Sequence, residues 1–239
     1  MKRIILTGGD GRFAKVFKKI KIKSKYRIFY PKKYELNIEN LNSIKKYFVK
    51  IKPDYLIHCA ALSRPMSIHE KNISKSISTN IIGTSNVVKI CNLYNTKLIY
   101  FSTNYVYPGK KGNYKENSPV LPINKYAMSK LGGECAVQMY DNSLILRICM
   151  TEKPFVHKQA FNDVEMNFMF HEDLAPNLLK LIDQKGIINV GGKKQKVINF
   201  ARKYNKKINP ISARKIIARN YPLNQSMNID KYKNIIKKK

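Results

Sequence analysis

The chain has 239 residues, enough for one domain with a substantial core and a smaller lobe. Lys and Arg number 46 against 15 acids, and the resulting formal charge of +31 favours anionic partners. The lysines are scattered and not gathered in one stripe, which favours compositional drift as the source of the charge over a dedicated binding surface. Because no aromatic–basic recognition motif is present, nucleic acid is disfavoured as a partner. No apolar run is long enough to cross a bilayer, and no signal-peptide pattern opens the chain.

Cysteine usage bears on the compartment and on metal binding. The four cysteines lack CxxC or Cys/His metal spacing, so no metal site is predicted. They lie in apolar surroundings, which indicates buried free thiols in a reducing cytoplasm. These residues are Cys59, Cys91, Cys135 and Cys149.

The hydrophobic pattern predicts strands that alternate with helices. The predicted strands cover residues 2–7, 26–30, 54–61, 97–102 and 143–148. Helical spacing follows the first strand, runs from Leu41 to a stop at Pro53, continues from Ile77 to Cys91, and recurs around Tyr126. This alternation indicates an α/β fold with a doubly wound parallel sheet of the Rossmann type. Because the alternation weakens near residue 150, we expect a Rossmann domain at 1–150 and a smaller, interwoven substrate-binding lobe at 151–239.

A glycine-rich turn joins the first predicted strand to its helix. The segment TGGDGRFA at 7–14 has the strand–turn–helix context that a dinucleotide fingerprint requires. Gly8 permits a tight turn, and Gly11 lets the backbone approach a pyrophosphate at the helix N-terminus. The alternative is a tight turn without a ligand. The predicted cofactor contacts in this turn are Gly8, Gly11, Arg12 and Phe13.

Tyr126 and Lys130 stand four residues apart and would share one face of a helix. A neighbouring ammonium favours the phenolate, so we expect the pKa of Tyr126 to fall below about 10. The alternative is a half-buried Tyr beside a solvated Lys. The ends of the predicted strands bring Gly8, Ala60 and Thr103 to the same edge of the sheet as Tyr126, where ligands of such folds bind.

Together these motifs resemble an extended short-chain dehydrogenase/reductase, and within that superfamily the dTDP-4-dehydrorhamnose reductase group of nucleotide-sugar reductases. The resemblance rests on the glycine turn, on FSTNYVYPG at 101–109, and on the pattern PxNxYxxSKxxGE at 122–134. HEDLA at 171–175, INVGG at 188–192 and RNYPLN at 219–224 resemble later landmarks of the same group. The match is collinear over nearly the whole chain.

The resemblance implies NADPH-dependent reduction of a 4-keto-6-deoxy nucleotide sugar, as in dTDP-rhamnose and other deoxysugar or polysaccharide biosynthesis. In that group Thr103 would hydrogen-bond the substrate carbonyl, Tyr126 would protonate the alkoxide, and Lys130 would also hold the nicotinamide ribose. Ala60 and Ala61 would pass under the cofactor, where bulk is not tolerated.

The substrate contacts implied in the same way are Ser102, Asn104 and Arg219. Arg219 is the candidate for a diphosphate contact, because a guanidinium can grip phosphate oxygens in a bidentate fork. Its alternative is an ordinary surface arginine. Asn80 matches a helix asparagine of the superfamily, with a satisfied buried amide as the alternative.

The end of the second strand bears on cofactor choice. NAD sites usually place an acid there, whereas the 2′-phosphate of NADP requires positive charge. Lys32 and Lys33 follow the strand, no acid comes before Glu35, and Arg12 is expected to join the two lysines around the phosphate. We therefore predict NADP(H), with NAD as the alternative, and place Asn37 near the adenine, where relatives often carry Asp.

Departures from the pattern limit the substrate. Asn104 and Tyr105 stand where a sugar dehydratase carries acids, and Asn104 stands where a GDP-fucose-synthase-like epimerase carries Cys. The chain is shorter than typical relatives, with the loss after Arg147. A nucleotide-sugar epimerase and a non-catalytic NADP-binding protein, like the regulatory subunit of methionine adenosyltransferase, remain alternatives. The oligomeric state stays open, a homodimer included.

Overall fold

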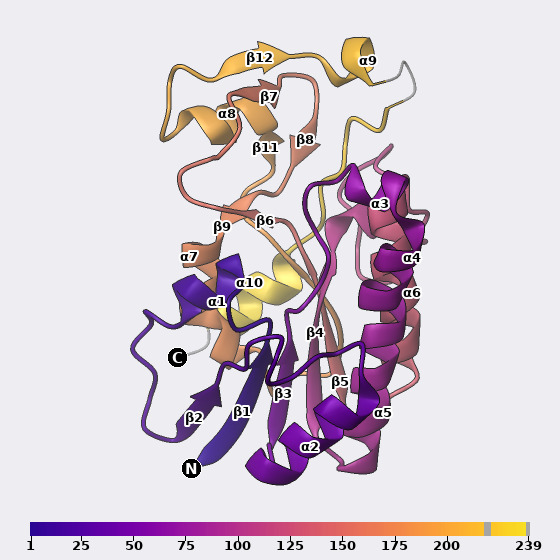
Figure 1. Cartoon of the computed structure of the whole chain (residues 1–239). Helices are drawn as coiled ribbons and strands as arrows, with labels where there is room; N and C mark the ends of the chain where they lie inside the picture. The colour runs from indigo at the N-terminus through magenta and orange to yellow at the C-terminus, as the bar shows by residue number, and fades with distance from the viewer. Residues whose placement is uncertain (218–220, 238–239) are drawn as a thin grey trace.

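The computed structural model describes residues 1–217 and 221–237. Its centre is a six-stranded sheet in the order β10-β5-β4-β3-β1-β2 (Figure 1). The strands are β1 (Lys2–Thr7), β2 (Tyr26–Phe29), β3 (Tyr55–His58), β4 (Lys97–Thr103), β5 (Ser143–Ile148) and β10 (Gly186–Val190). Neighbouring strands pair in parallel, so the doubly wound, Rossmann-type α/β fold is confirmed. The strand order reverses between β1 and β3, where such sheets open a crevice for ligands.

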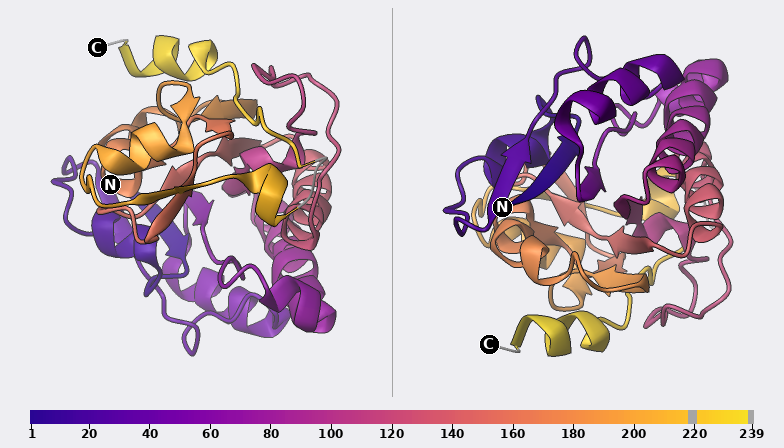
Figure 2. Two further views of the ribbon diagram at one scale, coloured as in Figure 1. Left: turned by 90° about the horizontal axis from the view of Figure 1, so that it is seen from above. Right: turned by 90° about the horizontal axis from the view of Figure 1, so that it is seen from below.

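Helices cover both faces of the sheet, which explains why its strands are almost continuously apolar. On β1, Ile5 packs toward one face while Ile4 and Leu6 pack toward the other. The first face is covered by α2 (Leu41–Ile51), α5 (Gly83–Leu93) and α6 (Lys125–Gln138). The second is covered by α1 (Arg12–Phe17), η3 (Ala175–Lys180) and α10 (Asp230–Lys237). Figure 2 shows α10, in yellow, on the opposite side of the molecule from the purple helices.

The segment after β3 differs from its prediction. The helix expected from Ile77 to Cys91 begins with a π-helix, η1 (Ile77–Ile82), that runs directly into α5. Two short helices, α3 (Ile68–Lys71) and α4 (Ile73–Ser76), precede it. Periodicity at 3.6 residues per turn cannot register a wider π turn, so the sequence pattern missed it.

After residue 150 the chain builds a lobe of short elements above the carboxyl edge of the sheet (Figure 1). Its strands pair as β6–β9, β7–β12 and β8–β11 around a separate apolar cluster. The elements of the lobe are β6 (Met150–Thr151), β7 (Gln159–Phe161), β8 (Glu165–Met166), β9 (Met169–Phe170), β11 (Gln195–Lys196), α8 (Val197–Arg202), β12 (Asn209–Ile211) and α9 (Ala213–Ile216). The short helix α7 (His171–Leu174) packs instead against α1 on a face of the sheet. Since β10 and α10 return to the sheet, residue 150 marks where the lobe begins and not where the sheet ends.

The cysteines depart from their prediction in part. All four are free thiols, but Cys135 on α6 is exposed and Cys59 is only partly buried. The prediction of four buried thiols is therefore wrong for these two, because Cys135 lies on the outer face of a helix whose inner face holds Glu134. Within residues 1–217 and 221–237, no helix is long and apolar enough to cross a membrane, and no cluster of His, Cys, Asp and Glu could hold a metal ion.

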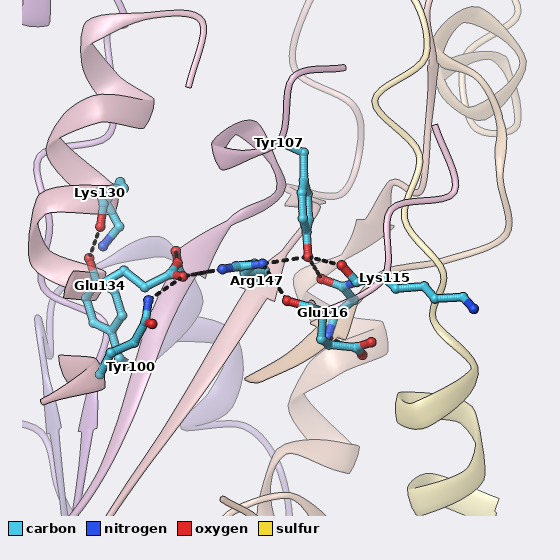
Figure 3. A network of polar contacts seen from close by, with 10 residues as sticks. Tyr100, Tyr107, Lys115, Glu116, Lys130, Glu134 and Arg147 are labelled. Carbon is cyan, nitrogen blue, oxygen red and sulfur yellow. Dashed lines mark hydrogen bonds and ion pairs between the residues drawn. The ribbon is translucent and has the colours of Figure 1, made fainter. Parts of the chain in front are cut away.

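A buried ion pair joins α6 to β5 (Figure 3). Arg147 donates from Nε (3.0 Å) and Nη2 (2.6 Å) to Oε1 of Glu134, and the two side chains are 3% and 0% exposed. Arg147 Nη1 also donates to the Tyr107 hydroxyl (2.8 Å) and to the Glu116 carbonyl (3.1 Å). Ser102 on β4 donates to the second carboxylate oxygen of Glu134 at 2.5 Å. The network holds α6, β4, β5 and the loop after β4 together.

We expect Arg147→Met to destabilise the fold strongly. The substitution leaves the buried Glu134 carboxylate without its cation, and removing one partner of a buried pair costs about 3–5 kcal/mol. Urea unfolding followed by circular dichroism measures the change. The double variant Glu134→Leu/Arg147→Met should recover most of the loss, while Lys233→Met, in an exposed pair, should change stability little. A single Arg147 variant as stable as the parent would contradict this expectation.

Candidate active site

The glycine turn between β1 and α1 is closed by tight contacts. Gly8 has φ +74°, and the Gly11 amide donates to the Gly8 carbonyl at 2.8 Å. A Cβ added at Gly8 would lie 3.1 Å from Ala60 Cα, and one at Gly11 would lie 2.9 Å from the Gly8 carbonyl oxygen. Gly9, which the sequence analysis did not single out, is equally constrained, because a Cβ there would collide with the Tyr30 carbonyl. The turn therefore excludes side chains at all three glycines.

Phe13 and Ala60 support this turn from within. The Phe13 ring is buried and packs on Phe17 and Phe101, with centroid distances of 5.7 and 5.1 Å. Phe13 thus offers a ligand only its backbone. The Ala60 amide donates to the Thr7 hydroxyl at 3.1 Å, which fixes the loop after β3 beside the turn, and Ala61 follows in the same loop.

The end of β2 holds an acid as well as the predicted cations. Lys32 and Lys33 are exposed there, and Lys33 Nζ lies 3.5 Å from Glu39. Glu35 folds back, and its Oε2 accepts from the Lys32 amide at 2.8 Å. The acid that seemed too far along the sequence therefore lies next to Lys32 in space. Asn37 Oδ1 accepts from the Glu39 amide at 3.1 Å in a local turn.

Arg12 lies in a different cluster from these lysines. Its Nε is 3.1 Å from Glu152 Oε1, and its Nη2 donates to the Ser63 hydroxyl at 3.0 Å. Arg64 donates from Nη1 to the other oxygen of Glu152 at 2.7 Å. Arg12 begins α1, and its side chain reaches across the sheet edge to the segments that follow β3 and β5. The prediction that Arg12 joins the two lysines around one phosphate is not what the structure shows.

Helix α6 is placed by its first turn and by a close contact with η1. Asn124 Oδ1 caps the helix by accepting from the Ala127 amide at 2.8 Å. Gly133 lets α6 approach η1, because a Cβ there would lie 2.6 Å from the Asn80 carbonyl. The result is that Tyr126, in the first turn, lies at the carboxyl edge of the sheet.

Tyr126 and Thr103 meet at this edge, as predicted. Burial raises the pKa of Tyr126, against the neighbouring Thr103 hydroxyl and the charges of Arg64 and Arg12, which lower it. The prediction of a pKa lowered by the neighbouring lysine is therefore wrong: burial dominates, and the cations that act on the phenol are the two arginines. Thr103 Oγ1 also accepts a local bond from the Tyr105 amide at 3.3 Å.

The Lys130 side chain extends from α6 toward Tyr100 on β4. It is buried, and its ammonium lies 4.2 Å from the centroid of the Tyr100 ring (Figure 3). Burial lowers the pKa of Lys130 to about 7, although Cys59 and Glu134 act to raise it. Burial and the charge of Lys130 lower the pKa of His58 to about 3, so this histidine is neutral. Lys130 is thus buried between the Tyr100 ring and the neutral imidazole of His58.

The remaining predicted residues divide into engaged and free groups. Ser102 is committed to Glu134 inside the molecule, which disfavours it as a substrate contact. Asn80 accepts from the Leu62 amide (2.8 Å), donates to its carbonyl (2.9 Å) and to Ser129 (2.8 Å), so it is a satisfied buried amide. Asn104 is buried, and its amide nitrogen finds no hydrogen-bond partner within the described ranges. Arg219 lies outside the described residues.

His69, Arg64 and Glu152 are site residues that the sequence analysis missed. The His69 ring lies 5.1 Å from that of Tyr126, and its Nδ1 shares a 2.7 Å hydrogen bond with Ser76. Its buried Nε2 has no partner in the part of the chain that the structure describes. These residues lie in loops and short helices without periodicity, so the usable signal was their position just after β3 and β5.

The first two thirds of the chain match a known protein family. The family model described as the RmlD substrate binding domain matches residues 1–159, about two thirds of the sequence. The chain belongs to the RmlD substrate binding domain family. The match covers the glycine turn, Thr103, Tyr126, Lys130 and the ion pair, but only the beginning of the lobe.

Curated relatives of this RmlD-family chain have two different roles by name. It is 32% identical to methionine adenosyltransferase 2 subunit beta of Xenopus laevis over 155 residues, which is 62% of this chain and 46% of the relative. It is 28% identical to dTDP-4-dehydrorhamnose reductase of Aggregatibacter actinomycetemcomitans over 154 residues, or 63% and 52% of the two chains. The matched part thus spans about half the length of these curated relatives.

The fold extends the likeness over the whole RmlD-family chain. A dTDP-4-dehydrorhamnose reductase from Bacillus anthracis, solved in complex with NADP, superposes with a TM-score of 0.87 and 24% identity. The comparison covers 98% of this chain and 93% of that one. The lobe after residue 150 therefore has a counterpart in a solved structure, although the family model stops early in it.

We expect Lys130→Met to raise stability at neutral pH in this RmlD-family chain. Burial lowers the pKa of Lys130 from 10.5 to about 7, so between these values the unfolded chain binds more protons than the folded one, and stability rises with pH. Below about pH 7 the whole destabilisation is present. Met fills a similar volume without the charge, so the variant should unfold at higher urea at pH 7 and show a flatter pH dependence up to pH 10. Equal slopes in the parent and the variant would contradict this.

Proposed function

We propose that this protein is an NADPH-dependent reductase of a 4-keto-6-deoxy nucleotide sugar. The observation that carries the proposal is the meeting of Thr103 and Tyr126 at the carboxyl edge of the sheet, beside the glycine turn and above the buried Lys130. The dTDP-4-dehydrorhamnose reductase of Bacillus anthracis, which is similar in fold over almost the whole chain, supports the reaction class and the cofactor.

The residues of the glycine turn fit a dinucleotide. Side chains are excluded at Gly8, Gly9 and Gly11, so the backbone of the turn is bare where a diphosphate would lie. Ala60 and Ala61 keep the neighbouring loop free of bulk. When bound, the cofactor supplies the hydride, and in our proposal it is NADP(H), with NAD left open.

The protein's own groups manage the proton and the charge. Because burial raises the pKa of Tyr126, its hydroxyl carries a proton at neutral pH and can donate it to an alkoxide oxygen. Thr103 can hydrogen-bond the same oxygen from the end of β4. Lys130 would bind the nicotinamide ribose. Because its pKa is about 7, Lys130 can both release and take up a proton near neutral pH.

An anionic nucleotide sugar suits the surroundings of this site. The strong positive charge of the chain attracts such a substrate, and the lobe after residue 150 provides a wall above the sheet edge. Asn104, directly after β4, is the candidate polar contact at this edge, because its buried amide nitrogen has no partner in the described residues. Arg219 remains a candidate diphosphate contact.

One alternative function, a non-catalytic NADP-binding regulatory subunit, is supported by an observation of its own. The relatives named methionine adenosyltransferase 2 subunit beta reach 32% identity, above the 28% of the named reductase. The presence of Thr103, Tyr126 and Lys130 favours catalysis over this alternative. A nucleotide-sugar epimerase of the same superfamily is the remaining alternative.

Tyr126→Phe should reduce the rate of NADPH oxidation with a 4-keto sugar nucleotide by roughly 10²–10⁴-fold, because the variant keeps the ring and loses the proton donor. Turnover is followed by absorbance against a panel of 4-keto sugar nucleotides, and NADPH affinity by fluorescence titration. Cofactor affinity should barely change. Near-normal turnover would remove Tyr126 from the mechanism, and NADP binding without turnover on any substrate, with co-purification of another enzyme, would favour the regulatory subunit.

Cofactor preference should depend on the balance of charge after β2. Replacing Lys32 and Lys33 together by Ala should weaken NADPH binding more than NADH binding, since the 2′-phosphate loses its cations. Glu35→Gln should act in the opposite direction and favour NADPH, because it removes the carboxylate next to the Lys32 amide. Isothermal titration with both cofactors measures these effects. Equal affinities of the unaltered protein for the two cofactors would refute the NADP assignment.

A further inference from the structure

Two arginines share one carboxylate beside Tyr126. Glu152 accepts from Arg64 at one oxygen (2.7 Å) and lies 3.1 Å from Arg12 Nε at the other. Arg12 comes from the start of α1, Arg64 from the loop after β3, and Glu152 from the segment after β6. Three chain segments therefore converge on a single ion-pair bridge at the carboxyl edge of the sheet.

The bridge carries an excess of positive charge. Arginine is always charged, and the pKa of Glu152 is lowered: burial opposes this, but a backbone hydrogen bond and the two arginines outweigh it. Burial lowers the pKa values of His171 and His157, and the charge of Arg64 adds to this effect, although Glu152 acts to raise both values. The two histidines therefore add no cation at neutral pH. One carboxylate thus balances two guanidiniums, which leaves a net charge near +1.

Arg64 has exposed surface and unused N–H donors that a ligand oxyanion could bind. Its side chain is 32% exposed, and its only hydrogen bond within the described ranges uses one nitrogen of a group that has five N–H donors. Arg12 has a second partner in Ser63, whereas Arg64 depends on Glu152. Both guanidiniums lie near enough to the Tyr126 phenol for their charges to lower its pKa, against the larger opposing effect of burial.

We propose that Arg64 binds an anionic group of the substrate, and that Glu152 occupies this oxyanion site until the substrate arrives. An incoming phosphate or carboxylate offers the guanidinium the same two-oxygen face that Glu152 presents. Arg12 is then free to turn toward the diphosphate of the cofactor. The inference rests on the proposed function for the nearness of the substrate carbonyl, but the binding of an oxyanion does not require turnover.

Substitutions at Glu152 and at Arg64 should change the affinity for an oxyanion in opposite directions. Glu152→Gln removes the internal competitor and should tighten oxyanion binding about tenfold, the order expected when one close charge is removed. Arg64→Gln removes the proposed ligand contact and should weaken binding by at least about tenfold. A bridge that is only structural would give the same sign for both variants, because either change leaves a partner unpaired.

Isothermal titration of the 239-residue chain, with and without saturating NADP⁺, tests these signs. The probes are dTDP and UDP as diphosphates, galacturonate as a sugar carboxylate, and glucose as a neutral control. The matched variant is Lys194→Gln, which breaks a 2.9 Å ion pair with Glu165 in the lobe, away from the bridge. It should leave probe binding unchanged, and melting temperatures should show that all variants are folded.

Tighter binding by Glu152→Gln together with weaker binding by Arg64→Gln supports the site, and the probe that responds identifies the oxyanion as a diphosphate or a carboxylate. Weaker binding in both variants, or no change in either, overturns it. A loss confined to NADP⁺ affinity in Arg64→Gln also overturns it, since Arg64 would then belong to the cofactor. These outcomes are separate from the turnover of Tyr126→Phe, so the failure of one proposal is distinguishable from the failure of the other.

Discussion

The buried pair of Glu134 and Arg147 is the interaction on which the arrangement of the site depends. It joins α6, which carries Tyr126 and Lys130, to the adjacent strand, and through Ser102 to β4, which ends at Thr103. Because both charges are removed from water, the pair is stable only with its hydrogen bonds complete. That requirement holds the tyrosine helix and the end of β4 in one register, so the two hydroxyls meet.

Electrostatics at the sheet edge are decided by burial more than by neighbouring charge. Burial raises the pKa of Tyr126 and lowers that of Lys130, so each group is shifted toward its neutral form. A protonated phenol near a lysine whose ammonium loses its proton readily suits the donation of a proton to an alkoxide. The positive field that an anionic substrate would meet comes from Arg12 and Arg64, and Glu152 forms an ion pair with each of them.

Relatives that share this scaffold are named both as a reductase and as a subunit of methionine adenosyltransferase. The division of the chain into a dinucleotide-binding part and a separate lobe explains how one scaffold can have both roles. The family match covers five of the six strands of the sheet, the glycine turn and α6, whereas β10 and most of the lobe after residue 150 lie outside it. A dinucleotide site can therefore persist while the lobe changes. Fold alone does not decide between a reductase and a regulatory subunit, so the choice rests on the groups that face the substrate.

The sequence by itself determined the first five strands of the sheet and the glycine turn, because strand periodicity and glycine spacing are local properties. It also placed Thr103 and Tyr126 at one edge of the sheet, because the carboxyl ends of parallel strands meet there. Tertiary structure decided the rest. The acid at the end of β2 is Glu35, which returns through a turn, and the sixth strand comes from Gly186–Val190, far beyond the regular alternation. Arg12, Arg64 and Glu152 meet although the chain separates them, and no local pattern records such a meeting. The direction of the Tyr126 pKa likewise followed from burial, which depends on neighbours that only the folded chain brings together.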